Sequence, residues 1–532
     1  MLNENETVTL TGDTEDISVL QHDYNLSELA LVFPNVNSML IPKKAAYTLG
    51  KYASKTKLKE IDPNIEVAVE KCLVVLSNLA STHYTDERWK ALSAEILHEQ
   101  TKTNDNTFIY KKIVTLLQEG TSNGPLVEVD DNYGIGVKCK KYRIADRYFD
   151  AGLTEYQIQD KGIVQRRNKL FYQQLSNALE NPICANLVKV YPKIELPTSE
   201  ELLVIGKRLA KEGYTTRKGK ILTVRNRHKN HYWTDAEKRS FVEDNIRLFE
   251  FLTSRGFMIP TAGDQRSGGR VVDSFTLMPA WIREQITIDG KTLSECDYTA
   301  LHPNIAVKLY GGSQSYITHQ NVAEMAAIGL KEVKTEHLAF FNRKWNQMVQ
   351  SPLFAFYSKH ENQMLEKIFR DKKDNGYKVT SMRMFKAEVG VMTDVIRHLS
   401  SKGIYVLYVY DALVCEMKDV QDVIQTMNRT ILEHGIKTHV KAKSTTEVVT
   451  KEPILPKFGP DDEVNLYQVL SAMSLSSRET MLVIGDLDRS VVKMKELVAY
   501  INKQNKEQKY NDYNGVDITA ERIGRLKGII AA

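Results

Sequence analysis

The chain has 532 residues, of which 42% are hydrophobic and 26% charged, and its formal net charge at pH 7 is +5. These values are typical of a soluble globular protein longer than one domain, and so small a net charge argues only weakly for a polyanionic partner. No apolar run reaches the roughly 18 residues of a membrane span, and the polar start lacks the pattern of a secretion signal. The five cysteines are widely spread without a CxxC pair, which favours a reducing, cytoplasmic setting without structural zinc.

Residues 1–240 are predicted to form a largely helical region that binds nucleic acid. Apolar residues recur at helical spacing between residues 64 and 120, and basic residues with aromatic neighbours then gather in three clusters. Lys and Arg neutralise phosphates, while aromatic faces stack on unpaired bases, so these clusters are candidate nucleic-acid contacts. The alternative is a solvent-exposed charged face. The clusters span Lys138–Arg143, Arg166–Tyr172 and Arg217–Trp233, the last of which contains the candidates Arg225, Arg227 and Lys229.

Two segments that are predicted to be buried strands end on an aspartate, Asp297 in one and Asp411 in the other. A single aspartate in such a place more often caps a helix or starts a turn. Two of them on adjacent strands would supply the hard oxygen ligands that Mg²⁺ prefers, and two such ions can stabilise both the attacking and the leaving oxygen of a phosphoryl transfer. We therefore predict Asp297 and Asp411 as catalytic residues and as ligands of two Mg²⁺ ions, with Glu295, Glu416 and Asp289 as weaker candidates.

The sequence also predicts how these aspartates are placed. Residues 285–297 carry an Asp289-Gly290 pair between β-forming residues, which is typical of a hairpin whose second strand would deliver Asp297. A helix over residues 382–400, with Glu388 on it, precedes a strand over 404–409 that would deliver the second aspartate. The two carboxylates meet if the two strands lie side by side.

The motifs around these aspartates resemble those of family A DNA polymerases and of the related single-subunit polymerases. Residues 297–312 resemble motif A, residues 409–416 resemble motif C, and residues 330–342 between them resemble the motif B helix of the fingers. Upstream, Gly269-Arg270 with Leu277 and Arg283 resembles the segment that precedes motif A. The resemblance covers roughly residues 265–440 and rests on the joint order of short motifs.

This resemblance implies an α+β right-hand polymerase fold with an antiparallel palm sheet and helical fingers. It places the palm and fingers core at residues 241–455, a thumb-like helical region at 1–240 and a helical C-terminal extension at 456–532. Arg270 and Arg283 would contact the primer–template.

For the nucleotide, the resemblance implies contacts from residues of motifs A and B. Lys334 matches the family's triphosphate-binding lysine, and Lys331 or Arg343 would stand in for an arginine that the family has where Leu330 lies here. An aromatic residue is usual where Asn342 lies. The remaining candidates are Tyr298, which follows the motif A aspartate, and His302.

His302 occupies the position where family A DNA polymerases have a glutamate that blocks the sugar 2′-hydroxyl. A bulky side chain there favours deoxynucleotides, although an imidazole could also hydrogen-bond a 2′-hydroxyl. The expected function is template-directed nucleotidyl transfer to a 3′ end, as a DNA-directed DNA polymerase that uses a primer–template and nucleoside triphosphates. The size and the lack of an exonuclease-type carboxylate group would suit a phage or mobile element.

Two alternatives stay open. The first is a single-subunit DNA-directed RNA polymerase. The second is a non-catalytic nucleic-acid-binding replication protein with a degenerate palm, which the departures at Leu330, Asn342 and Tyr410 keep open. The sequence does not indicate protein partners.

Overall fold

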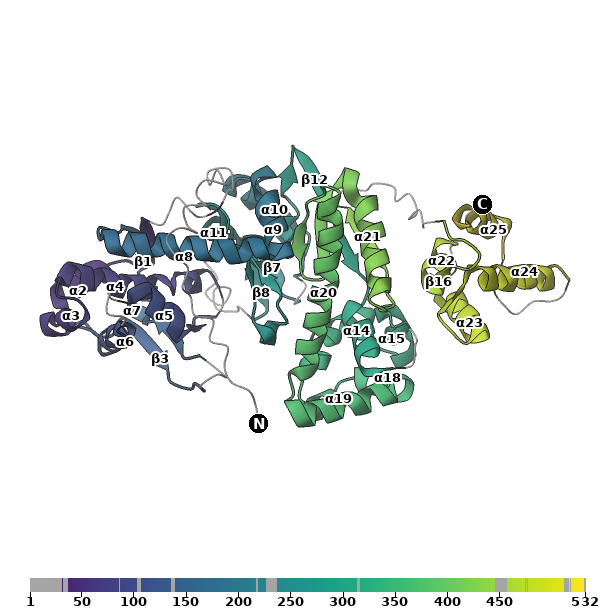
Figure 1. Ribbon diagram of the computed structural model, residues 1–532, viewed down its shortest axis with the longest axis horizontal. Coiled ribbons are helices and arrows are strands. Elements are labelled where there is room, and N and C mark those ends of the chain that lie inside the picture. The colour runs from purple at the N-terminus through teal and green to yellow at the C-terminus, as the bar shows by residue number, and fades with distance from the viewer. Residues whose placement is uncertain are drawn as a thin grey trace. The chain divides into compact units, whose positions relative to one another are not determined.

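The computed structural model describes residues 31, 37–85, 87–102, 107–134, 139–216, 219–225, 237–312, 316–444, 457–473, 475, 477–510, 516 and 518–530. The chain divides into two compact units, and Figure 1 labels their elements. The first unit comprises residues 1–181, 196–261 and 277–283, and the second comprises residues 182–195, 262–276 and 284–532. The predicted domain boundaries at 240/241 and 455/456 stay predictions.

The first unit combines helices with short strands. Its elements are β1 (Ser38–Pro42), α2 (Ala45–Tyr52), α3 (Lys55–Ile61), α4 (Ile65–Ser77), η3 (Ala80–Tyr84), β2 (Lys90–Ala91), α5 (Ala94–Thr101), α6 (Ile109–Glu119), β3 (Val127–Asp130), β4 (Lys141–Ile144), α7 (Asp146–Phe149), β5 (Leu153–Gln157), α8 (Lys161–Glu180), α10 (Ser199–Lys211), β7 (Ile221–Thr223), β8 (Arg239–Phe241), α11 (Val242–Thr253) and α13 (Ala280–Arg283). β9 (Thr261–Ala262) and α12 (Ser274–Leu277) lie at the division between the units.

Helix α4 forms the centre of the first unit's core. Its residues Cys72, Leu73 and Leu76 are fully buried, and β1, α2, α3, α5 and α6 pack around the helix. The helix begins where Asn64 accepts hydrogen bonds from the backbone N–H groups of Glu66 and the following residue. Such a cap satisfies donors that the first turn leaves without a partner, so it fixes where the helix starts.

The second unit holds the segment from which the candidate active site is built. Its elements up to residue 444 are α9 (Pro182–Val190), η4 (Tyr191–Lys193), β6 (Ile194–Glu195), η6 (Gln265–Ser267), β10 (Val271–Val272), β11 (Thr287–Ile288), β12 (Lys291–Tyr298), α14 (Leu301–Tyr310), α15 (His319–Ala326), α16 (Leu330–Ala339), η7 (Phe340–Asn342), α17 (Trp345–Val349), α18 (Leu353–His360), α19 (Asn362–Asn375), α20 (Val379–Ser401), β13 (Leu407–Val409), β14 (Ala412–Glu416), η8 (Met417–Asp419), α21 (Val420–Glu433) and β15 (Val440–Ser444).

An antiparallel sheet with the strand order β13-β14-β12-β11-β6 organises this unit, and β15 also pairs with β12. The hairpin predicted around Asp289-Gly290 is present as β11 and β12, with Ile288 opposite Lys291. Both loop residues have positive φ (51° and 66°), which is the type I′ turn that Asp-Gly favours. The strand predicted to deliver Asp411 is β13, and β14 lies between it and β12, so the two predicted strands do not lie side by side. Asp411 instead lies in the loop that joins β13 to β14, and β14 pairs with β12.

Long helices cover this sheet. α20 packs against α9, α14 and α21, and α21 packs against β12, β14 and β15. Figure 1 shows α20 and α21 running side by side. The predicted helix over 382–400 is confirmed as α20, whose buried residues include Met392, Val395 and Ile396. α20 therefore contacts both α14, the helix that follows Asp297, and α21, which packs on the sheet.

The C-terminal part of the second unit has a hydrophobic core of its own. Its elements are β16 (Glu463–Asn465), α22 (Leu466–Ala472), α23 (Ser477–Leu487), β17 (Val491–Lys493), α24 (Met494–Tyr510) and α25 (Ala520–Ile529). Leu466, Val469, Leu470 and Met494 of that core are fully buried. Among the helices that the structure describes across both units, none is long and apolar enough to cross a bilayer.

Candidate active site

Asp297 lies near the end of β12, at the centre of the sheet. It pairs with Ala412 of β14 on one side and with Lys441 of β15 on the other. Its neighbours Cys296 and Tyr298 are buried, whereas Asp297 is only partly buried. Strand pleating puts Asp297 on the face opposite to these two neighbours, so the strand projects a carboxylate from a rigid backbone.

Asp411 lies in the tight loop between β13 and β14. Val409 pairs with Ala412, so Tyr410 and Asp411 form a two-residue hairpin loop. Tyr410 has a positive φ of 60°, which is the type II′ pattern that normally takes glycine at its first loop position. The backbone N–H of Tyr298 lies 3.5 Å from the carbonyl oxygen of Asp411. The backbone of Asp411 therefore lies beside β12, next to the paired residues Asp297 and Ala412.

Three charged or titratable side chains form a tight cluster beside Asp411. Glu388 of α20 accepts two hydrogen bonds from Arg270, at 2.8 Å from Nε and 2.6 Å from Nη2. His302 of α14 places its Nε2 atom 2.6 Å from Glu388 Oε2 and 3.1 Å from Arg270 Nη2. The Glu388 side chain is fully buried, while the Arg270 and His302 side chains retain 19% and 25% of their exposure. One buried carboxylate thus holds two predicted site residues.

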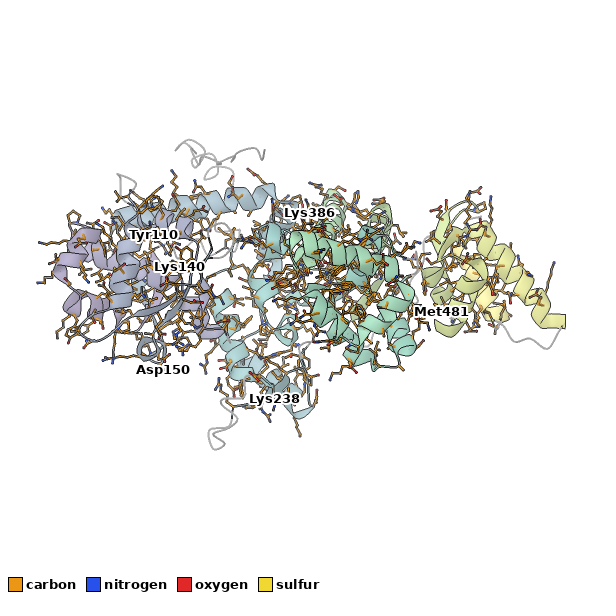
Figure 2. All side chains as sticks on the ribbon, turned by 90° about the horizontal axis from the view of Figure 1, so that it is seen from below. Tyr110, Lys140, Asp150, Lys238, Lys386 and Met481 are labelled. Carbon is orange, nitrogen blue, oxygen red and sulfur yellow. The ribbon has the colours of Figure 1, made fainter. Side chains whose placement is uncertain are left out.

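Aromatic rings fix the guanidinium of Arg270 from two directions. Its central carbon lies 3.7 Å from the ring centroid of Phe385 and 4.9 Å from that of Tyr410. The loop before Arg270 lies directly on α20, because a Cβ atom at Gly268 would stand 2.5 Å from the backbone nitrogen of Lys386. Lys386 is labelled in Figure 2. This cation is therefore held by a salt bridge and ring contacts, on a loop in which Gly268 allows the close approach to α20.

The charges of the cluster shift the pKa values of its members. Burial alone would raise the pKa of the Glu388 carboxyl, but hydrogen bonds from His302 and Arg270 and the positive charge of Arg270 leave that pKa below its ordinary value. Burial would lower the pKa of Arg270, but the hydrogen bonds that it donates to Glu388 and the negative charge of that carboxylate outweigh burial and raise the pKa. The pKa of Asp411 is raised, first by burial and then by the negative charge of Glu388. Arg270 and Glu388 are therefore a firmly ionised pair.

Tyr408 of β13 buries a hydroxyl next to this cluster. Its side chain is fully buried, and its Oη atom finds no hydrogen-bond partner among the residues that the structure describes. Burial, followed by the negative charge of Glu388, raises the pKa of Tyr408 far above its usual range. The phenol is therefore neutral, and its hydroxyl is a donor that the folded chain does not use.

The carboxylate donor set suits Mg²⁺ in number and type. Within the described ranges no group of three or more His, Cys, Asp or Glu side chains could hold a metal ion. Mg²⁺ is commonly bound by only one or two protein carboxylates together with substrate phosphates, so Asp297 and Asp411 fit such a site. The weaker candidates lie elsewhere: Glu416 ends β14 and pairs with Lys418, and Asp289 occupies the turn at the opposite end of β12.

The predicted nucleotide-binding lysines lie on an exposed face of α16. Lys331 and Lys334 are both exposed, and neither forms an ion pair with a described residue. Asn342, just after this helix, is exposed and accepts a hydrogen bond from Ser381 at 3.0 Å. The ammonium groups of both lysines are thus available to bind an anionic ligand.

A buried hydrogen-bond chain anchors α16 to its neighbours. His337 contacts His319 of α15 at 2.9 Å through Nδ1 and Tyr357 of α18 at 2.8 Å through Nε2. Burial, together with the nearby positive charge of Lys334 and Lys441, lowers the pKa of His319 to about 4. Burial and the charge of His319 lower the pKa of His337 to about 3. These two histidines are accordingly neutral at pH 7.

Two of the predicted contacts have hydrogen-bond partners outside the cluster. Tyr298 is 3% exposed, and its hydroxyl donates to the carbonyl of Met427 at 2.8 Å, so its ring belongs to the core between the sheet and α21. Arg283 donates to the carbonyl oxygen of Met278 at 2.8 Å within the first unit. A nucleotide contact from Tyr298 would therefore have to come from its backbone.

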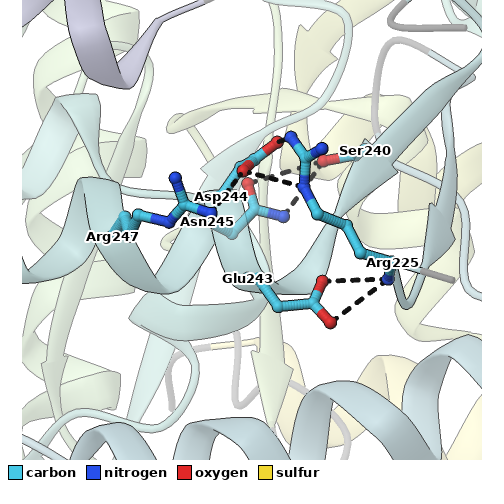
Figure 3. A network of polar contacts seen from close by, with 6 residues as sticks. All are labelled: Arg225, Ser240, Glu243, Asp244, Asn245 and Arg247. Atoms are coloured by element: carbon cyan, nitrogen blue, oxygen red, sulfur yellow. Dashed lines mark hydrogen bonds and ion pairs between the residues drawn. The ribbon is translucent and has the colours of Figure 1, made fainter. Parts of the chain in front are cut away.

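Arg225, which the sequence predicts to contact nucleic acid, is hydrogen-bonded to two carboxylates of the protein. Its guanidinium donates to both carboxylate oxygens of Asp244, and its backbone N–H lies 3.1 Å and 3.2 Å from the two oxygens of Glu243 (Figure 3). Its guanidinium also lies 4.6 Å from the ring centroid of Phe241. The companion candidates Arg227 and Lys229 fall outside the described residues.

Residues of the other two basic clusters likewise have internal partners. Lys140 pairs with Asp131, and Arg143 makes two hydrogen bonds to Glu128 (Lys140 is labelled in Figure 2). On α8, Arg166 donates to the carbonyl of Lys102 and Arg167 to that of Ser38. These cations stabilise the first unit itself, which the sequence pattern did not indicate.

Sequence reasoning named Glu388 only as a polar residue on a helix, and it missed Phe385. Both lie on α20, three residues apart, which puts them on the same helix face. An otherwise apolar helix face that carries one acidic and one aromatic residue could have indicated that the acidic residue is buried against an arginine.

Comparison with known proteins adds little to this description. No protein-family model matches the chain, and no curated protein matches it. Among solved structures the chain is similar, with a TM-score of 0.34 and 10% identity, to the POL domain of Pol1 from M. smegmatis in complex with DNA primer-template and dNTP. That match covers 53% of this chain and 73% of the other. A likeness of this size cannot decide a fold or a function, so any functional conclusion must come from the site itself.

Proposed function

We propose that this protein is a template-directed nucleotidyltransferase, with DNA synthesis from a primer–template as its expected reaction. The observation that supports the proposal is the placement of Asp297 on β12 beside the loop that carries Asp411. Asp297 pairs with Ala412, the residue directly after Asp411, at the end of the sheet where Arg270 and His302 also gather. Two carboxylates beside a fixed cation are suited to binding Mg²⁺ and the anionic substrate of a phosphoryl transfer.

Each of these groups has a distinct role in the proposed reaction. Asp297 and Asp411 would hold Mg²⁺, which when bound supplies positive charge for the transferring phosphate. Arg270 offers one partly exposed guanidinium in a fixed position, suited to nucleic acid near the reacting end. Lys334 on α16 offers a mobile ammonium for the triphosphate, as the resemblance implies.

Primer extension tests the proposal directly. The full-length protein is incubated with a labelled primer–template and Mg²⁺, with dNTPs and NTPs in separate reactions. We expect extension with dNTPs that chelation of Mg²⁺ abolishes. Asp297→Asn and Asp411→Asn keep the side-chain shape but remove the charge, and each should lower the extension rate on the order of 100-fold or more.

Asp289→Asn is the matched control, because Asp289 occupies the turn at the other end of β12 and asparagine tolerates its positive φ. This variant should extend as the wild type does. Extension that survives in Asp411→Asn would contradict the proposed site. Duplex binding without extension in any reaction would instead favour a non-catalytic nucleic-acid-binding protein, and extension with NTPs alone would indicate an RNA polymerase.

A further inference from the structure

Lys441 is a basic residue beside Asp297 that the sequence motifs did not indicate. It lies on β15 directly opposite Asp297 of β12. Residues paired in this way project from the same face of an antiparallel sheet, with their Cβ atoms about 4.5–5.5 Å apart. The next pair, Tyr298 and Val440, is on the other face, where the Tyr298 hydroxyl donates to the carbonyl of Met427 on α21. Lys441 therefore shares the face of the sheet that carries the Asp297 carboxylate.

The ammonium group of Lys441 is accessible to a ligand. The side chain is exposed, and it forms no ion pair and no hydrogen bond with a residue that the structure describes. Burial, followed by the positive charges of Lys334 and Lys441, lowers the pKa of His319 on α15. Two lysines from different elements, one on the sheet and one on α16, thus lie close to the same histidine.

The order of these groups across the sheet relates them to different parts of a substrate. β14 pairs with one edge of β12 and β15 with the other. Asp411 lies in the loop that leads into β14, so Lys441 is on the opposite side of Asp297, toward His319 and Lys334. A chain of phosphoryl groups that reacts between the two aspartates and extends away from Asp411 would therefore pass Lys441.

We propose that Lys441 binds the β- and γ-phosphoryl groups of the incoming nucleoside triphosphate, which are the groups that leave as pyrophosphate. This inference rests on the proposed function. A lysine ammonium is a compact cation with three donors, suited to phosphoryl oxygens, and the pairing of β15 with β12 fixes its backbone relative to Asp297. Arg343, another cation near α16, is already bound to Glu336 by hydrogen bonds of 2.6 Å and 3.0 Å.

A role limited to balancing the charge of Asp297 is the alternative, and it predicts a different result. A cation beside Asp297 opposes the binding of a divalent metal ion at that carboxylate. If this were the only effect of Lys441, its removal would lower the Mg²⁺ concentration needed for half-maximal rate. The KM for the nucleotide would then stay the same.

Steady-state kinetics of single-nucleotide incorporation distinguish the two roles. The full-length wild type, Lys441→Gln and Lys441→Arg are compared over a range of dNTP and Mg²⁺ concentrations. We expect Lys441→Gln to raise the KM for dNTP about tenfold or more, the loss of one charge-assisted hydrogen bond. Lys441→Arg should recover most of this loss because it keeps the charge. In the reverse reaction, the KM for pyrophosphate should rise by the same factor, because pyrophosphate consists of the β and γ groups alone.

Lys308→Gln is the matched control. Lys308 is an exposed lysine in the last turn of α14, and it forms no ion pair with a described residue. It is at the end of that helix far from Asp297, which precedes the first turn. This variant should keep the wild-type KM values for dNTP and pyrophosphate.

Lysine labelling gives a readout that does not depend on catalysis. The wild-type protein is acetylated with a limiting amount of N-hydroxysuccinimidyl acetate in the presence of Mg²⁺, with and without inorganic tripolyphosphate. Mass spectrometry then gives the extent of modification at each lysine. Tripolyphosphate should protect Lys441 several-fold and leave the modification of Lys308 unchanged.

The outcomes separate this inference from the proposed function. An unchanged KM for dNTP in Lys441→Gln overturns the inference, whether the variant changes its Mg²⁺ dependence or its affinity for the duplex instead. A higher KM for dNTP with an unchanged KM for pyrophosphate overturns the assignment to the β and γ groups. No incorporation by the wild type overturns the proposed function, and protection from labelling then decides whether Lys441 binds a polyphosphate.

Discussion

The backbone of Tyr410 has a conformation that residues other than glycine rarely adopt. Its φ of 60° lies in the left-handed region, directly before Asp411. Such strain persists only where surrounding contacts impose it, and it is common at functional sites. Here the Tyr410 ring packs on Arg270 and lies 6.2 Å from the ring of Tyr408. The ring contacts hold the loop in the conformation that presents Asp411.

Comparison of Tyr410→Gly with Tyr410→Ala isolates this strain. Both variants lose the ring, but only glycine adopts a positive φ without steric cost. Tyr410→Gly should therefore be more stable than Tyr410→Ala by about 1 kcal/mol in denaturant unfolding. Both should extend primers more slowly than the wild type because Arg270 loses a ring contact. Equal stability of the two variants would show that the loop is not strained.

The buried hydroxyl of Tyr408 has no hydrogen-bond partner among the described residues. A buried hydroxyl without a partner costs about 1 kcal/mol or more, so Tyr408→Phe should raise the free energy of unfolding by about that amount. Tyr191→Phe is the matched control, because the buried hydroxyl of Tyr191 donates to Asp273 at 2.5 Å and its removal should destabilise. Lower stability of Tyr408→Phe would contradict the prediction and indicate a hydrogen-bond partner such as a buried water.

At the scale of elements, the loop before Arg270 depends on its closeness to α20. Gly268 and Gly269 both have positive φ, at 65° and 81°, so alanine is strained at either position. The two positions differ in the room available for a side chain. A Cβ atom at Gly268 would lie 2.5 Å from the backbone nitrogen of Lys386, whereas a Cβ atom at Gly269 would have its nearest neighbour 3.8 Å away. The two glycines are thus a matched pair in which only one is needed for packing.

Gly268→Ala should consequently lower the free energy of unfolding more than Gly269→Ala does. Both variants bear the strain of a positive φ, about 1 kcal/mol, but Gly268→Ala must also move the loop from α20. Moving the loop displaces Arg270 from Glu388, so primer extension should fall much further in Gly268→Ala than in Gly269→Ala. Equal losses in stability and activity would contradict a role for this close approach.

Three histidines, one buried and two partly buried, couple the stability of the second unit to pH. Burial, the largest cause in each case, lowers the pKa of His319 to about 4, of His337 to about 3 and of His439 to about 4. The ordinary value is 6.5, so below that pH the unfolded chain takes up protons that the folded chain refuses. Stability is therefore complete above pH 6.5 and is lost as the pH falls toward 4 and 3.

The measurement is denaturant unfolding at pH 7 and pH 5. The free energy of unfolding should be lower at pH 5, because each pKa unit of depression is worth about 1.4 kcal/mol once the unfolded histidine is protonated. His337→Gln removes one such group, so it should lower stability at pH 7 but show a shallower loss between the two pH values. An identical pH dependence in this variant would contradict the assignment to His337.

Prediction from sequence succeeded where local preferences fix the structure. Asp-Gly between β-forming residues adopts a type I′ turn whatever surrounds it, so the hairpin before Asp297 was predictable, as was the long amphipathic helix α20. The placement of Asp411 was predictable only in part. The strand before it was expected over 404–409 and begins at Leu407, and the positive φ of Tyr410 was not foreseen.

Turn chemistry and the spacing of apolar residues were enough to predict the hairpin before Asp297, the helix α20 and a strand shortly before Asp411. Only the tertiary structure decided the partners of the charged side chains. Glu388 lies 118 residues from Arg270 and 86 from His302, and Arg225 meets Asp244 rather than solvent. The reason is physical: local preference acts within a few residues, whereas the partner of a charge depends on which distant segments the core brings together.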